Sequence, residues 1–240
     1  MTPLGDAASI VSLILYLATA AGLMFRSRWR LSWFFAAHVA FSGVVSSLIQ
    51  CWPDYFFRQW FYLIMHTIAA VLRMGIATEL AWRIFRPFPG ARKTALMAIA
   101  TILAITAFAL PTGPRVDSAE WEVIWGQLFP LLRAGTVWLM ATPLLLALWY
   151  HVPVRRFHAE LLTSWVLYLG LTTAVLKIQS AGIGLAVYGM QGRLIDDLQH
   201  VPDFLQHCYW VYIAWKPDNA TVVAHDATLR QLENGVPSCG

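Results

Sequence analysis

Charged residues are scarce in this sequence. Asp, Glu, Lys and Arg make up 12% of its 240 residues, whereas soluble proteins carry about 25%. Hydrophobic residues make up 58%, which is more apolar surface than a soluble fold of this length can bury. The composition therefore argues against a soluble domain. It predicts an all-α fold, a polytopic bundle of transmembrane helices surrounded by membrane lipids.

Cysteine is also scarce, and the common catalytic motifs are missing. Three cysteines without a CxxC spacing give no reason to expect a metal site or a disulfide framework. The sequence contains no GxSxG, HExxH or P-loop pattern. These absences favour a protein that is not an enzyme, although they leave the question open, and they point to no particular cofactor. The net charge of +4 comes from short basic clusters between apolar segments, so nucleic-acid binding is not expected.

About seven apolar segments are long enough to be membrane-crossing helices, which need about 20 residues each. They cover residues 8–25, 31–50, 56–85, 94–110, 123–150, 158–178 and 202–215. The last segment is the shortest, so whether it spans the membrane is left open. Residues 179–200 can extend the preceding helix, re-enter the membrane or lie on its surface.

The basic residues between these segments predict an orientation. Lys and Arg concentrate in short loops on the cytoplasmic side of membrane proteins. The first, third and fifth loops carry most of them: Arg26, Arg28, Arg30, Arg86, Arg92, Lys93, Arg155 and Arg156. We therefore expect the N-terminus outside and the C-terminus in the cytoplasm. Residues 1–216 would form the transmembrane domain, and residues 217–240 a short polar cytoplasmic tail.

Arg73 is the first candidate for a binding residue. It lies fifteen residues after Arg58 in the third segment, which places it about 22 Å deeper along a helix. His66 lies seven residues earlier on nearly the same helix face. Ionisable groups at such depth face protein or water. The pair predicts either a pocket for an anion, a lipid headgroup or another ligand, or a structural bond to a neighbouring helix.

Glu79, Arg133 and Lys177 are the other ionisable residues inside apolar segments. Glu79 precedes Arg83 by four residues, the spacing of an ordinary ion pair on one helix face, but it can also serve as a proton or cation site. Arg133 and Lys177 can extend their charged ends to the outer interface. Alternatively, they can meet Arg73 and form a basic cavity for an anionic ligand.

Two histidines raise the possibility of haem or pigment binding. His38 and His66 lie in neighbouring segments, and histidine is a common axial ligand of haem iron. The alternative is that each histidine donates a hydrogen bond to an adjacent helix. Small residues, including Gly75, Gly135 and Gly170, are expected to let the helices pack closely.

Three stretches resemble an uncharacterised family of bacterial seven-transmembrane-helix proteins. They are LRMGIATELAWRIFRPFPGARK, LLRAGTVWLMATPLLLALWYHVPV and the ending WVYIAWKP. Glu79 and Arg133 stand at matching positions of that family. The resemblance implies a seven-helix topology in a bacterial inner (cytoplasmic) membrane, and it implies no activity.

The sequence therefore leaves several functions open. The first is a seven-helix sensor, or an accessory subunit of a larger membrane complex with other membrane proteins as partners. The second is a small transporter or channel that uses Arg73 and Glu79. The third is a haem- or pigment-binding membrane protein.

Overall fold

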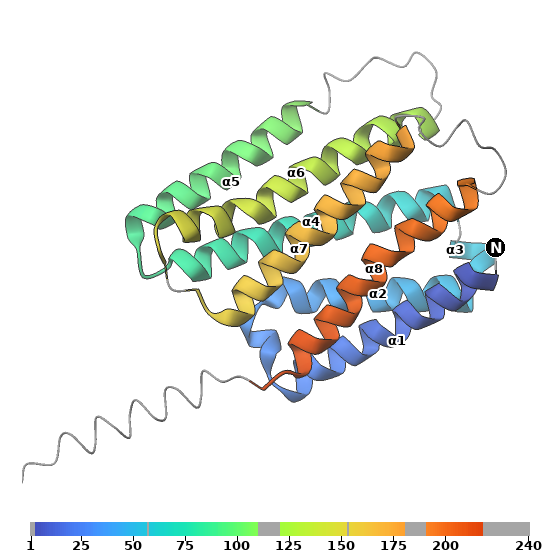
Figure 1. Cartoon of the computed structure of the whole chain (residues 1–240), viewed down its shortest axis with the longest axis horizontal. Helices are drawn as coiled ribbons and strands as arrows, with labels where there is room; N and C mark the ends of the chain where they lie inside the picture. Colours follow the sequence, from blue (N-terminus) through green and yellow to red (C-terminus); the bar gives the residue numbers. More distant parts are fainter. Residues whose placement is uncertain (1–2, 57, 110–120, 153, 181–190, 218–240) are drawn as a thin grey trace, which may run out of the picture.

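The computed structural model describes residues 3–56, 58–109, 121–152, 154–180 and 191–217, and within these ranges all regular structure is helical (Figure 1). The predicted all-α class is therefore confirmed. One short 3-10 helix, η1, covers Arg28–Leu31. The α-helices are α1 (Pro3–Phe25), α2 (Trp33–Cys51), α3 (Pro53–Phe56), α4 (Gln59–Phe85), α5 (Pro89–Ala109), α6 (Trp121–Trp149), α7 (Arg156–Ser180) and α8 (Gln191–Trp215).

Apart from the four-residue α3, each of these α-helices coincides with one of the predicted segments. The largest difference is at α8, which begins at Gln191 and continues through Pro202, where the sequence predicted a start at residue 202. The first turns of α8 carry polar residues, including Asp196 and Asp197. A search for apolar runs does not detect such a stretch.

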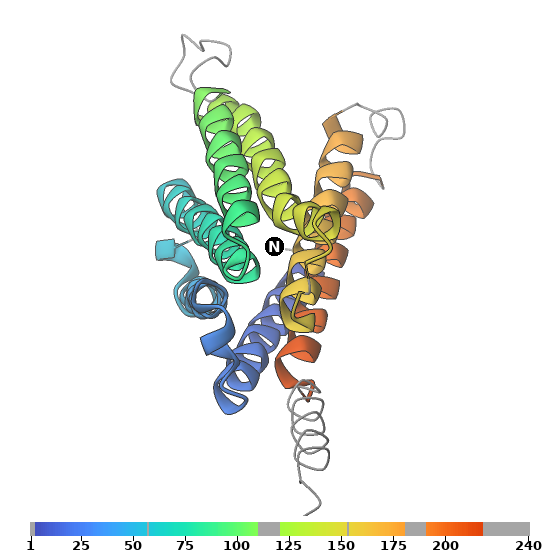
Figure 2. The same ribbon diagram turned by 90° about the vertical axis from the view of Figure 1, so that its left-hand side faces the viewer.

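The long helices run alternately in opposite directions, so the C-terminal ends of α1, α4, α6 and α8 lie at the same end of the molecule (Figure 1). Helices that follow one another in the chain pack together, and α8 packs against α1, which closes the seven long helices into a ring. A further contact joins α4 to α6. Figure 2 shows α4, α5 and α6 on one side of the molecule and α7 and α8 on the other.

Two segments within the described residues are long and apolar enough to cross a membrane. They are Trp33–Cys51, which is α2, and Ile64–Phe85 within α4. The shorter apolar helical stretches Ser9–Phe25 and Gly135–Trp149 lie in α1 and α6.

Large apolar side chains cover much of the outside of the bundle. Leu17 and Val44 are each 58% exposed although they lie in the middle of their helices. Similar exposed residues occur on the other long helices: Val71, Ile105, Trp138, Leu145, Leu167, Leu171 and Tyr212. Soluble proteins rarely expose contiguous apolar surface of this extent, so the outside of the bundle is suited to an apolar surrounding.

Glycine allows close helix contacts at two of the three expected positions. A side chain at Gly75 would collide with Phe34 of α2, and one at Gly135 would lie 2.6 Å from the Thr106 hydroxyl of α5. The prediction for Gly170 is wrong, because a Cβ there would have no atom within 4 Å. Gly170 is on an exposed face of α7.

Candidate functional site: a buried polar cluster at the centre of the ring

Polar and aromatic side chains from five helices meet inside the ring. We call this group the central cluster; its contacting members are Tyr16 of α1, His38 of α2, Arg73 of α4, Trp165 of α7, and His207 and Trp210 of α8. We include Gln206, which is buried one helical turn before Trp210 on the same face of α8. In a soluble protein such groups would face water. Here they face one another inside a core that also contains many apolar side chains, among them Phe35, Leu161 and Leu169.

Trp165 and Trp210 form the middle of the central cluster. Their ring centroids are 5.0 Å apart, and the His38 ring lies 5.2 Å from Trp165 and 6.0 Å from Trp210. His207 packs 5.3 Å from Trp210 and 4.3 Å from the Tyr16 ring. Most of these pairs are edge-on, as aromatic rings prefer, so the cluster is closely packed.

Four buried polar atoms of the central cluster have no hydrogen-bond partner within the described part of the chain. They are Nδ1 of His38, Nε1 of Trp165, Nε2 of Gln206 and Nδ1 of His207. Trp165 is 1% exposed and His38 is 3% exposed. A buried polar group without a partner costs about 1–3 kcal/mol. By contrast, the Trp210 indole nitrogen donates to the Ser164 hydroxyl at 3.3 Å.

The central cluster is electrically asymmetric. The Arg73 guanidinium carbon lies 5.6 Å from the centre of the Trp165 ring, a cation–π distance, and the positive charge of Arg73 acts on His38. Asp203 of α8 acts on His207 and, together with Arg73, on Tyr16. Trp165 and His38 are therefore next to a positive charge, His207 is influenced by a carboxylate, and Tyr16 is influenced by both charges.

Glu79 has a different position and a structural role. Its carboxylate accepts hydrogen bonds from the Ser32 hydroxyl at 2.9 Å and from the backbone N–H groups of Trp33 and Phe34 at 3.0 Å. These are the first donors of α2, which need partners at a helix N-terminus. The predicted pairing with Arg83 is confirmed, because an Arg83 nitrogen lies 2.7 Å from Glu79. Glu79 thus caps α2 from the adjacent helix α4.

The same end of the bundle holds two further polar links. Arg28, which is buried, donates to the carbonyls of Ile213 and Lys216 and so caps the C-terminus of α8. The Lys216 ammonium donates to the Glu160 carboxylate of α7 at 2.8 Å. We call this region the basic end. Its contacts tie α8 to α7 and to the segment that follows α1.

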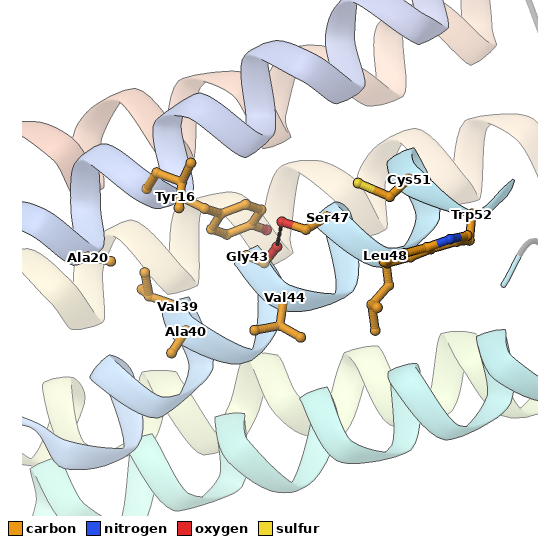
Figure 3. A pocket seen from close by; sticks show the side chains of 11 residues that line it. Tyr16, Ala20, Val39, Ala40, Gly43, Val44, Ser47, Leu48, Cys51 and Trp52 are labelled. Carbon is orange, nitrogen blue, oxygen red and sulfur yellow. Dashed lines mark hydrogen bonds between the residues drawn. The ribbon is translucent and has the colours of Figure 1, made fainter.

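A shallow groove lies between α1 and α2, and Tyr16 of the central cluster forms part of its wall (Figure 3). Its volume is about 240 Å³, and apolar or small side chains line it, including Ala20, Ala40 and Gly43 (Figure 3). Ser47 donates to the carbonyl of Gly43 at 2.8 Å, so its hydroxyl is already satisfied (Figure 3). The groove offers apolar contact and little polar recognition.

The structure brings together two of the candidates from the sequence, Arg73 and His38, through their shared contact with Trp165. His66 is half-buried two turns before Arg73 on α4. The backbone positions of Arg133 and Lys177 fall in α6 and α7, but their side chains lie outside the described residues. The predicted basic cavity of Arg73, Arg133 and Lys177 therefore stays a prediction.

Sequence reasoning missed Trp165, Gln206 and His207. It searched for formal charge inside apolar segments, and these residues carry none in their neutral forms. A usable signal was present in α8, because Gln206 and His207 precede Trp210 by four and three residues and share its helix face. Within the described residues, no group of three His, Cys, Asp or Glu side chains is arranged to hold a metal ion.

No protein-family model, curated protein or solved structure matches this chain.

Proposed function

We propose that this protein is a seven-helix membrane sensor that binds a small ligand in its central cluster. The observation that carries the proposal is a set of buried polar atoms at His38, Trp165, Gln206 and His207 that lack a hydrogen-bond partner among the described residues. Folded proteins satisfy nearly all such atoms with protein or bound molecules. A ligand among these side chains would supply the missing hydrogen bonds, and five helices would respond to its presence.

The membrane location in this proposal is supported by two observations. Two segments are long and apolar enough to span a bilayer, and large apolar side chains are exposed along the long helices. We propose that all seven long helices cross, with the basic end in the cytoplasm, since Arg and Lys gather there. A bacterial inner membrane, and membership of the uncharacterised family resembled, are part of this proposal.

Cys51 offers a direct test of the orientation. It is exposed at the end of α2 that lies opposite the basic end. In intact cells, a membrane-impermeant maleimide is expected to label Cys51 in a variant that retains this cysteine alone. Labelling only after the membrane is permeabilised would show that the proposed orientation is wrong.

Ligand binding is tested by thermal unfolding of the purified, detergent-solubilised chain in the presence of a small-molecule library. A ligand that binds the folded state alone raises the unfolding temperature. The expected hit loses its effect in Trp165→Phe and keeps it in Trp138→Phe, a matched change on the outer face of α6 where Trp138 is 61% exposed. A library without any Trp165-dependent hit would contradict the proposal.

The basic end favours a sensor over a transporter or channel. Arg28, Glu79 and Lys216 join helix ends there through hydrogen bonds and an ion pair. A ring of helices joined at one end in this way suits a protein that binds a ligand without letting it cross the membrane. Flux that disappears in Arg73→Ala at unchanged expression would instead support transport. A fixed partner set after purification in mild detergent would support an accessory subunit, whose contacts the exposed aromatic residues Trp138 and Trp149 could make.

A further inference from the structure

The turn between α4 and α5 carries positive charge that no described residue balances. Arg86 and Lys93 are exposed there, and Arg92 is half-buried. Among the described residues, no hydrogen bond or ion pair engages these three side chains. Glu79, the carboxylate of α4, is already bonded to Arg83, and the first turn of α5 carries no acidic residue. The turn is therefore suited to an anionic partner.

Trp82 of α4 holds Arg92 in place. The Arg92 guanidinium carbon lies 4.5 Å from the centre of the Trp82 ring, and the backbone N–H of Arg92 donates to the carbonyl of Phe88 at 2.9 Å. A guanidinium that stacks on a ring keeps its N–H edges available for hydrogen bonds. Arg86 follows Trp82 by four residues and shares its helix face. Two arginines beside one ring can bind a phosphate, which accepts their hydrogen bonds in pairs.

An apolar stripe leads from Trp82 along the outer face of α4. Trp82 is 46% exposed, and Ile64, Ile68 and Val71 are exposed on the same helix face. Val71 lies eleven residues before Trp82, which is about 16 Å along a helix. This is roughly half the thickness of a hydrocarbon core of about 30 Å, so the stripe is as long as one leaflet is deep. An acidic soluble protein would match the arginines alone, whereas a phospholipid matches the arginines and the stripe.

We infer that the turn between α4 and α5 binds an anionic phospholipid of the bilayer. Its phosphate contacts Arg86 and Arg92, and one acyl chain lies along Trp82 and Val71. This inference goes beyond the proposed function, with which it shares only the membrane location. The site is at the basic end of the bundle and uses no residue of the central cluster.

The test is native mass spectrometry of the full chain in detergent, with dioleoyl phosphatidylglycerol or dioleoyl phosphatidylcholine added at equal concentration. The two lipids have the same acyl chains and differ in the net charge of the headgroup. Phosphatidylglycerol is expected to bind about thirtyfold more tightly, the combined effect of two cations on an anionic lipid. Glycerol phosphate, a soluble phosphate ester without acyl chains, is expected not to compete at the concentration of the lipid.

Two variants locate the effect at the turn. Arg92→Gln and Arg86→Gln each remove one cation and are expected to weaken phosphatidylglycerol binding about fivefold. Phosphatidylcholine binding should stay the same in both variants. Arg26→Gln is the matched control, because Arg26 is an exposed arginine on the segment that follows α1, and it should leave the binding of both lipids unchanged. If Arg92→Gln does not fold, Arg86→Gln still decides the outcome, since Arg86 is exposed.

Several results would overturn the inference. Equal binding of the two lipids would do so, as would an equal loss of phosphatidylglycerol binding in Arg26→Gln and the turn variants, which would show attraction by the basic end as a whole. Competition by glycerol phosphate at the lipid concentration would show that the turn binds free phosphate esters instead. Polyglutamate that binds through Arg92, without a preference for phosphatidylglycerol, would indicate an acidic protein partner.

These results are independent of the proposed ligand of the central cluster. A chain without lipid preference can still show a Trp165-dependent ligand, and a chain without such a ligand can still prefer phosphatidylglycerol. Recovery of the chain in the soluble fraction of cells would overturn both proposals, because both require a bilayer.

Discussion

Replacing Glu79 by glutamine tests whether a carboxylate of one helix holds the start of another. Glu79 receives four donors, namely the Ser32 hydroxyl, the N–H groups of Trp33 and Phe34, and Arg83. Glutamine retains one acceptor oxygen and has no charge. It can therefore satisfy about half of these donors, and its own NH₂ group cannot accept a bond from Arg83.

The expected loss follows from these contacts. Two lost hydrogen bonds to a charged group would cost about 3–6 kcal/mol if fully buried. Trp33 is 55% exposed and Phe34 is 42% exposed, so solvent or lipid headgroups can replace part of the lost hydrogen bonding. We therefore expect a loss of about 2 kcal/mol in the free energy of unfolding, which is within the range for a lost helix cap. For a chain of this length the unfolding temperature should fall by about 4–8 °C.

The assay is thermal unfolding in detergent, followed by circular dichroism. Thr78→Ala is the matched control, because Thr78 neighbours Glu79 and is exposed. Among the described residues, its hydroxyl bonds within its own helix, donating to the carbonyl of Met74 at 2.9 Å. Its unfolding temperature should stay within about 2 °C of the parent chain, as surface changes usually do. An equal unfolding temperature for Glu79→Gln and the parent chain would refute the capping role.

Four further substitutions give defined outcomes in the same assay. Arg28→Lys replaces the planar guanidinium, which donates to two carbonyls, with a single ammonium group. The C-terminus of α8 should then be held less well, and the free energy of unfolding should fall by about 2 kcal/mol. An unchanged free energy of unfolding would contradict the capping role of Arg28. Gly135→Ala should destabilise by about 1–3 kcal/mol through overpacking against α5, whereas Gly170→Ala should be neutral or slightly stabilising; equal effects would contradict the described packing. The hydrogen bonds of Lys216 to Glu160 and then to Tyr212 raise the pKa of Lys216 above its ordinary value of 10.5. The stability that the Lys216–Glu160 pair contributes should therefore be fully present below about pH 10.5 and be lost as the pH rises through the higher folded-state pKa. A Lys216→Met chain should not show this alkaline loss of stability. Identical alkaline stability profiles for the two chains would contradict the role of this pair.

Much of the fold follows from local sequence signals. The apolar runs identified the positions of the long helices apart from the first half of α8, because the length of such a run is a property of the segment alone. The pairing of Glu79 with Arg83 was also accessible, since a four-residue spacing sets neighbours on one helix face. The capping of α2 by Glu79 could not be predicted from the sequence, because it depends on how α4 lies beside Ser32.

In the central cluster, too, some features could be predicted from local sequence and others depend on how the helices pack. Arg73 and His38 were recognisable as polar residues in apolar segments, but their common contact with Trp165 depends on the relative depth of three helices. Sequence does not set that depth to within one helical turn, about 5.4 Å. Gln206 and His207 escaped notice because neutral polar residues are far commoner in helices than the charged groups used as markers.

The packing of α8 against α1 has a consequence for the biogenesis of the protein. The carbonyls that Arg28 caps lie at the C-terminal end of α8 and directly after it, and α8 leaves the ribosome after α1 to α7. Until then, the guanidinium has no access to Ile213 and Lys216, and the Trp215 indole has not yet reached the Ala18 carbonyl at 3.0 Å. Closure of the ring between α1 and α8 therefore waits for the synthesis of α8, and a chain cut before α8 would lack the carbonyls that Arg28 caps.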